Sequence, residues 1–180
     1  MKPCLRLATL AAALVVTAAG AATREELVSI EAVQRPGSAV VCSATYTPPG
    51  QTRSLLFITR AQVTARVNGQ MHARVQDVYA SGETPYIYKT YTGVSTLEET
   101  RQKVEVDPDS IRIRFPSNPA AQPALEEDAR RETVSYVAFD KVRLLSPGKW
   151  VVEADPANGN PVDMQCAQEA PGDPSAAWDF

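Results

Sequence analysis

Apolar residues recur at every second position in several short runs of the chain. These runs are rich in Val, Ile, Thr and aromatic residues, which favour β-strands. Gly, Pro, Asn and Asp residues occupy nearly all the gaps between them and indicate turns. The predicted strands are residues 39–45, 55–67, 71–79, 86–91, 103–106, 111–115, 133–145, 150–154 and 162–167. We therefore expect an all-β fold, mainly an antiparallel sandwich or barrel of about 8–9 strands.

The alternation also predicts the register of the hairpin at Asn68-Gly69. A two-residue turn would set an apolar face of one strand against a polar face of the next. We therefore expect a three-residue turn over residues 67–69, with Gly69 in the left-handed conformation. This turn pairs Ala65 with Met71, Val63 with Ala73 and Ala61 with Val75, and leaves Arg60, Gln62, Thr64, Arg66, His72 and Arg74 on the opposite face.

A second hairpin is predicted at residues 107–110, where Asp-Pro-Asp-Ser has the composition of a type I turn. A four-residue turn pairs Val106 with Ile111 and Val104 with Ile113. In this register Arg112 and Arg114 point outward together.

Signals for helices are few, and we expect one or two short ones. Residues 23–26 and 96–99 each fit a capping box, in which a Thr and a Glu three positions later bind free backbone N–H groups. Residues 124–131 favour a short helix within a Pro-rich connection. In residues 25–33 the apolar spacing fits a helix and a strand equally well.

The first 22 residues have the pattern of a secretory signal peptide. Lys2 and Arg6 precede an apolar run from residue 7 to about residue 17, which ends in small residues. The run is shorter than the roughly 20 apolar residues that span a bilayer. We expect cleavage near Ala22 and no transmembrane segment in the mature chain. A single β-rich domain is expected over residues 23–169, followed by a flexible acidic tail over residues 170–180.

Removal of the signal peptide leaves two cysteines, Cys42 and Cys166. Exported proteins form disulfides, and alternation places both residues on apolar strand faces, so we predict that they are bonded. The alternative is a metal site in which the thiols join Met71, His72 and Met164, a set that suits copper. No two of these residues have a recognised metal-ligand spacing, which favours the disulfide.

Charge and composition restrict the function. The chain has 18 basic and 21 acidic residues, and removal of Lys2 and Arg6 changes the net charge from −3 to −5. Such a charge argues against a nucleic-acid partner. His72 is the single histidine, which removes most schemes of acid–base and metal catalysis. A glycosidase-like pair of two distant carboxylates is the catalytic alternative. The sequence therefore favours a non-catalytic protein, with no cofactor and no metal site.

Two groups of residues are candidates for a partner-binding surface. The predicted strand at residues 86–91 carries tyrosines on both faces, which suits an aromatic surface for a protein or glycan. A strand buried on one side with its tyrosine hydroxyl groups at the rim is the alternative. Arginines on the predicted polar face fit an anionic envelope component or an acidic partner, and a solvated outer face is again the alternative. The candidate residues are Tyr86, Tyr88, Tyr91, Arg60, Arg66 and Arg74.

A short motif near the C-terminus suggests a ligand carrier. Gly148-Lys149-Trp150 resembles the Gly-x-Trp motif of lipocalins. In lipocalins this motif lies on the first strand, whereas here it falls near the end of the chain, so no site residue is carried over. A ligand-binding barrel is compatible with eight or nine antiparallel strands and one linking disulfide.

The sequence thus favours an exported, disulfide-bonded, β-rich interaction or structural module, either periplasmic or secreted. Its expected partner is a protein or glycan of the cell envelope or extracellular space. The alternative is a lipocalin-like carrier of a small apolar ligand in a barrel interior. The two differ physically, because a carrier needs an enclosed cavity and an interaction module needs a filled core and an exposed patch.

Overall fold

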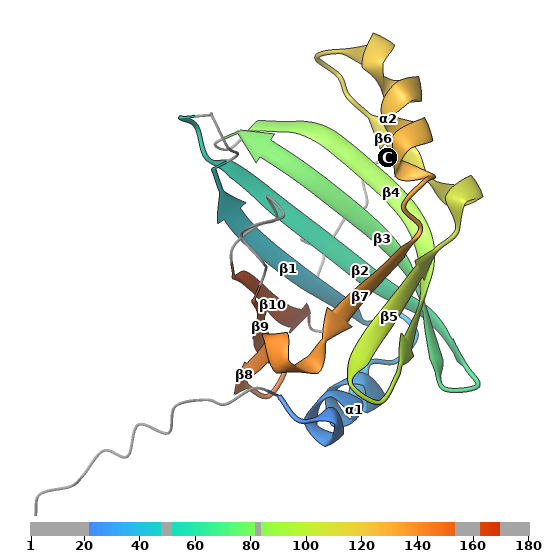
Figure 1. Ribbon diagram of the computed structural model, residues 1–180, viewed down its shortest axis with the longest axis vertical. Coiled ribbons are helices and arrows are strands. Elements are labelled where there is room, and N and C mark those ends of the chain that lie inside the picture. Colours follow the sequence, from blue (N-terminus) through green and yellow to red (C-terminus); the bar gives the residue numbers. More distant parts are fainter. Residues whose placement is uncertain (1–21, 48–51, 82–83, 154–162, 170–180) are drawn as a thin grey trace, which may run out of the picture.

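The computed structural model describes residues 22–47, 52–81, 84–153 and 163–169 (Figure 1). Its strands are β1 (Ala39–Tyr46), β2 (Leu55–Val67), β3 (Gln70–Ser81), β4 (Thr84–Leu97), β5 (Arg101–Val106), β6 (Arg112–Arg114), β7 (Val134–Ala138), β8 (Val142–Ser146), β9 (Lys149–Val152) and β10 (Met164–Glu169). Its helices are α1 (Arg24–Val33) and α2 (Gln122–Ala129), with short 3₁₀ turns at η1 (Pro108–Ser110), η2 (Pro119–Ala121) and η3 (Phe139–Lys141). The prediction of a mainly antiparallel all-β fold with one or two short helices is confirmed. The predicted signal peptide, up to residue 21, and the predicted tail lie outside the described residues.

The strands form one sheet that curls into half of a barrel. Its order is β7-β5-β4-β3-β2-β1-β10-β9-β8, and β6 pairs with β4. The edge strands β7 and β8 are separated in sequence only by η3, yet β7 pairs with β5 and β8 pairs with β9. The predicted strand at residues 133–145 is therefore two strands that belong to opposite edges. Figure 1 shows the long strands β1 to β4 as the curved wall, with β7 in front of them.

The β2–β3 hairpin has a two-residue turn, so the predicted three-residue turn is wrong. Asn68 and Gly69 have φ values of 51° and 78°, as the turn requires. A bulge at Thr64 shifts the register of β2 against β3 by one residue. Apolar residues of the two strands therefore pair with each other from Val63 toward the start of β2. The pairs are Val67–Gln70, Arg66–Met71, Ala65–His72, Val63–Ala73 and Ala61–Val75. The last two pairs are as predicted, whereas the bulge moves Arg66 from the predicted polar face to the concave face of the sheet.

Strands β5 and β6 do not pair with each other, so the predicted hairpin at residues 107–110 is wrong. β5 pairs with residues 93–97 of β4, and β6 pairs with residues 88–90 of the same strand. Between them, Asp107 N donates to Thr92 O at 3.0 Å, and Thr92 N donates to Ser110 Oγ at 2.8 Å. These bonds hold η1 against β4, and the chain continues along the same edge instead of reversing.

Helix α1 begins with the predicted capping box. Thr23 Oγ1 accepts a hydrogen bond from Glu26 N at 3.2 Å, and Glu26 Oε2 accepts one from Thr23 N at 2.8 Å. Residues 25–33 are thus helical. The predicted capping box at residues 96–99 is wrong, because these residues end β4 and turn toward β5. There the carboxylate of Glu98 accepts a hydrogen bond from Arg101 Nε at 2.6 Å.

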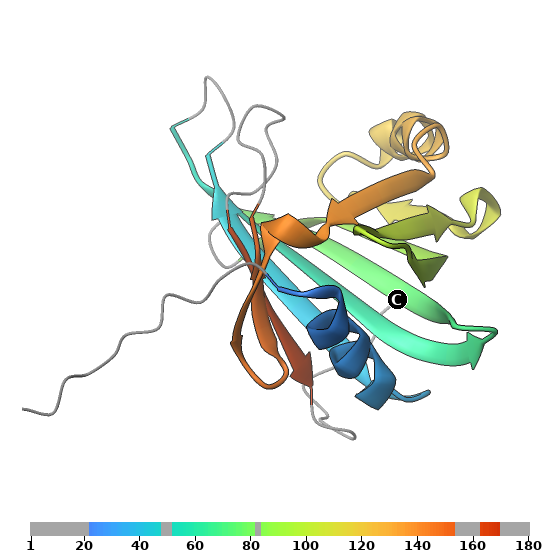
Figure 2. The same ribbon diagram turned by 60° about the horizontal axis from the view of Figure 1, so that its bottom comes forward.

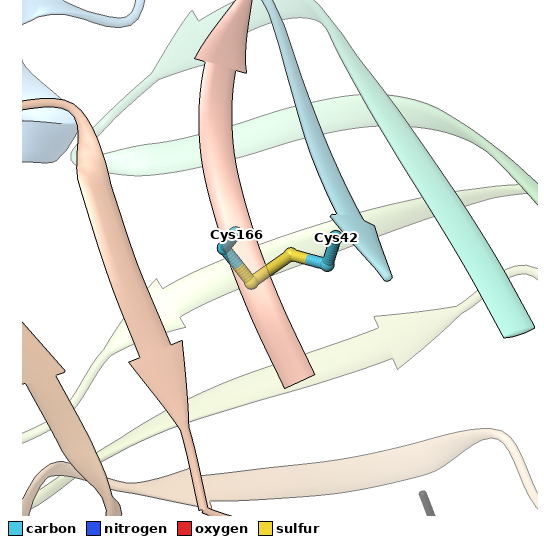
Figure 3. Close-up of a disulfide and its surroundings, with 2 residues drawn as sticks. All are labelled: Cys42 and Cys166. Carbon is cyan, nitrogen blue, oxygen red and sulfur yellow. A yellow bond between two sulfur atoms is a disulfide. The ribbon is translucent and has the colours of Figure 1, made fainter. Parts of the chain in front are cut away.

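Cys42 and Cys166 form a disulfide between neighbouring strands (Figure 3). They lie directly opposite each other on β1 and β10, and 124 positions separate them in the sequence. Strand β10 joins the β8–β9 hairpin to the rest of the sheet. The bond therefore fixes the C-terminal strands to the N-terminal part of the half-barrel.

We expect this disulfide to contribute about 2–5 kcal/mol to the free energy of unfolding, because it restricts the unfolded chain. Reduction of the mature protein should lower the urea midpoint by a corresponding amount, measured by circular dichroism. The double variant Cys42→Ala and Cys166→Ala is the control, and reductant should not shift its midpoint. A wild-type midpoint that reductant leaves in place would contradict the prediction.

Candidate ligand-binding cavity

Helix α1 lies on the concave side of the sheet, beside the β8–β9 hairpin (Figure 2). The chain at its N-terminal end contacts the edge strand β8 and the turn between β4 and β5. Ala22 N donates to Val142 O of β8 at 2.5 Å, and Arg24 Nε donates to Glu98 O, after β4, at 3.3 Å. The helix therefore covers the opening that the unpaired edges leave.

Arg66 holds the C-terminal end of α1. Its guanidinium group donates to Gln34 O at 2.8 Å and to Glu31 O, two carbonyl groups at the end of the helix. Arg66 Nη1 also lies 3.7 Å from the Glu31 carboxylate. A cation at this end of a helix is favourable because it binds free carbonyl groups and attracts the partial negative charge of the helix dipole.

The carboxylate of Glu31 joins the helix to β4 and β5. Gln102 Nε2 lies 2.9 Å from Glu31 Oε1 and 2.6 Å from Ser95 Oγ. Burial raises the pKa of Glu31, and this effect exceeds the opposing effects of the Arg66 charge and of hydrogen bonds from Gln102 and Arg66. The helix is thus held by a buried polar network.

A cavity of about 260 Å³ lies between α1 and the concave face. Its walls come from α1 and from all the strands except β6, and they are mostly aliphatic. Examples are Val40, Ala61, Val63, Val75, Val104 and Trp150. The Cys42–Cys166 disulfide is part of the wall. Such a cavity suits an apolar ligand.

Small residues give the cavity its width near the middle of the wall. Ala73 on β3 and Gly93 on β4 pair with each other, and both line the cavity. A Cβ atom on Gly93 would lie 3.0 Å from the backbone oxygen of Glu105, closer than such atoms normally approach. The glycine therefore permits β5 to pair closely with β4 while it leaves the cavity open.

A polar cluster follows the apolar wall along β3. Asp77 lies two positions beyond Val75 on the same strand face and is 5% exposed. Thr59 and Tyr91, which both line the cavity, hydrogen-bond to its carboxylate, and Lys89 Nζ lies 3.9 Å from its Oδ2. Burial raises the pKa of Asp77 more than the Thr59 hydrogen bond, the Lys89 charge and the Tyr91 hydrogen bond lower it.

The three candidate tyrosines lie in different surroundings. Tyr91 is on the concave face, where burial raises its pKa and Lys89 Nζ lies 4.7 Å from the centre of its ring. Tyr88 points to the opposite face, and the Arg114 guanidinium lies 4.6 Å from its ring centre. Tyr86 is the extra residue of a bulge in β4 and lies 6.2 Å from the ring of Phe115.

The three candidate arginines also do not share one face. Arg60 is on the convex face, where its Nη2 lies 2.6 Å from the Glu169 carboxylate. Alternation along β3 places Arg74 on the convex face as well. Arg66 is on the concave face as a result of the bulge. The structure therefore brings only Arg60 and Arg74 to the same side of the sheet.

The structure does not bring together the residues of the alternative metal site. Both thiols are used in the disulfide. Met71 and Met164 line the cavity, while His72 follows Met71 on the strand and points to the other face. The sequence interpretation did not single out Glu31 or Asp77. The sequence could nevertheless have indicated Asp77, because this acidic residue stands two positions after Val75, where the alternation of the strand predicts an apolar residue.

The comparisons with known proteins do not assign this chain to a family. No protein-family model matches the chain, and no curated protein matches it in sequence. Neither helix in the described residues is long and apolar enough to cross a membrane. Functional inference therefore depends on the cavity and the groups around it.

We expect Arg66→Gln to loosen α1, because the variant loses contacts with Glu31 and Gln34 and leaves a buried carboxylate without its cation. The free energy of unfolding should fall by about 1–3 kcal/mol. Hydrogen exchange at the backbone amides of α1 should accelerate more than exchange in β2 and β3. The exposed Arg53 provides a control, and Arg53→Gln should leave α1 unchanged. Equal acceleration in both variants would refute the role of Arg66.

Proposed function

We propose that this chain is an exported, non-catalytic protein that binds an apolar, chain-like ligand inside the half-barrel. The observation that carries this proposal is the cavity of about 260 Å³ between α1 and the apolar concave face. An apolar cavity of this size lowers stability when it is empty, because its walls lack packing partners. A ligand that fills it with methylene groups recovers those contacts and buries its own apolar surface.

The alternative of a partner-binding surface has less support. That function needs its candidate residues on one exposed patch. The candidate tyrosines and arginines instead divide between the two faces of the sheet, and Tyr91 and Arg66 belong to the cavity and the helix contacts. The geometry therefore favours the ligand carrier over the interaction module.

Two features support export as part of the proposal. The pattern of residues 1–22 is that of a signal peptide. The disulfide that lines the cavity is typical of proteins in oxidising compartments. We place the mature protein in the periplasm or outside the cell.

Ligand binding is tested with a decane chain that carries bromine, because bromine quenches a nearby indole and Trp150 lines the cavity. Quenching of Trp150 fluorescence by bromodecane should saturate in the wild type. In Ala73→Phe the new ring occupies the cavity, and the affinity should fall at least about tenfold. Gln76→Phe changes the opposite face of the same strand and should bind like the wild type.

The variant Trp150→Phe identifies the quenched residue, since the second tryptophan, Trp178, is in the predicted tail. Saturable quenching should disappear in Trp150→Phe. Unsaturable quenching in the wild type, or equal binding by Ala73→Phe, would exclude a ligand in this cavity.

Export is tested by mass spectrometry of the protein recovered from the cells that make it. We expect a mature N-terminus near Ala22 and a mass that corresponds to two oxidised cysteines. A chain that retains residues 1–22 would contradict removal of the signal peptide.

A further inference from the structure

We propose that Asp77 forms a recognition site for the uncharged hydroxyl group of a long-chain ligand. The inference rests on the proposed function and adds the chemistry of the ligand's polar end. In this arrangement the hydrocarbon chain fills the apolar cavity, and the hydroxyl group donates a hydrogen bond to Asp77 Oδ1. The ligand class is a single-chain alcohol or another neutral amphiphile with a free hydroxyl group.

The position of Asp77 supports this site. The residue is 5% exposed and follows Val75 along the concave face of β3. Its two hydrogen-bonding neighbours, Thr59 and Tyr91, line the cavity. Asp77 does not itself line the cavity, and a ligand that extends past Val75 would meet its carboxylate behind Thr59 and Tyr91.

One oxygen of this carboxylate is left for a ligand. Among the described residues, Asp77 Oδ1 has no hydrogen-bond partner although it is buried. Buried acceptors are nearly always hydrogen-bonded, because the loss of water is otherwise uncompensated. The hydroxyl group of the proposed ligand would supply a donor for this acceptor.

The charges at the site favour a neutral donor. Lys89 Nζ lies 3.9 Å from Asp77 Oδ2 and 4.7 Å from the centre of the Tyr91 ring. This ammonium group already balances the carboxylate, so a cationic ligand would meet like charge beside it. An anionic ligand would meet the carboxylate itself. A hydroxyl group supplies the donor without adding a charge.

A second buried acceptor provides a matched control. Gln34 is 4% exposed and lines the cavity, and within the described part of the chain its Oε1 has no hydrogen-bond partner. Gln34 belongs to the α1 side of the cavity, whereas Asp77 follows the wall along β3. Substitution of each residue distinguishes which acceptor binds the hydroxyl group.

The test measures how well four decyl compounds relieve the quenching of Trp150 by bromodecane. In the wild type, decanol should compete about tenfold better than decyl methyl ether, a ratio expected for one hydrogen bond to a charged group. Decylamine and decanoate should compete less well than decanol. Equal competition by decanol and its ether would overturn the inference, as would a preference for the amine or the acid.

Asp77→Leu should remove the preference for decanol over the ether, and Gln34→Leu should retain it. The opposite result would move the hydroxyl site to Gln34 and overturn the role of Asp77. Circular dichroism establishes whether each variant folds. If Asp77→Leu does not fold, Asp77→Asn is used, and the preference should fall severalfold because an amide oxygen is a weaker acceptor than a carboxylate. An unchanged preference in Asp77→Asn would also overturn the inference.

Failure of the hydroxyl site is distinguishable from failure of the proposed function. If bromodecane binds saturably but no decyl compound shows a preference that depends on Asp77, the cavity binds apolar chains and the inference alone is wrong. If bromodecane does not bind saturably to the wild type, the proposed function fails and the hydroxyl site fails with it.

Discussion

The unpaired edges of the sheet are the constraint on which the rest of the structure depends. Strands β7 and β8 follow each other in the sequence, but each pairs at the opposite end of the sheet. A half-barrel with open edges leaves an apolar concave face that must be covered. Helix α1 covers it, with Leu27 and Ile30 toward the cavity and its N-terminal end in contact with β8 and with the turn between β4 and β5.

The way in which α1 is held explains why a cavity remains beneath it. The hydrogen bonds between the helix and the sheet lie near its ends, and they include those from Arg66 to the C-terminal carbonyl groups. Ala73 and Gly93 on the facing wall are too small to fill the space under the helix. The same arrangement therefore closes the half-barrel and preserves an interior for a ligand.

The two buried carboxylates near the cavity differ in how completely the protein satisfies them. Glu31 is fully engaged with Arg66 and Gln102, and it joins the helix to the sheet. Asp77 keeps one buried oxygen without a partner among the described residues. This oxygen is the acceptor to which the proposed ligand hydroxyl group donates.

Local patterns in the sequence determined the strand content, the capping box of α1, and apolar faces on which Cys42 and Cys166 meet. These features depend on alternation and on residues a few positions apart, so they are readable along the chain. The bulge at Thr64, the pairing of both β5 and β6 with β4, and the separation of β7 from β8 were decided only by the tertiary structure. Each depends on which distant strand supplies the hydrogen-bond partners. The cavity and its Asp77 cluster follow from those choices, because they exist only once β2, β3 and β4 lie side by side beneath α1.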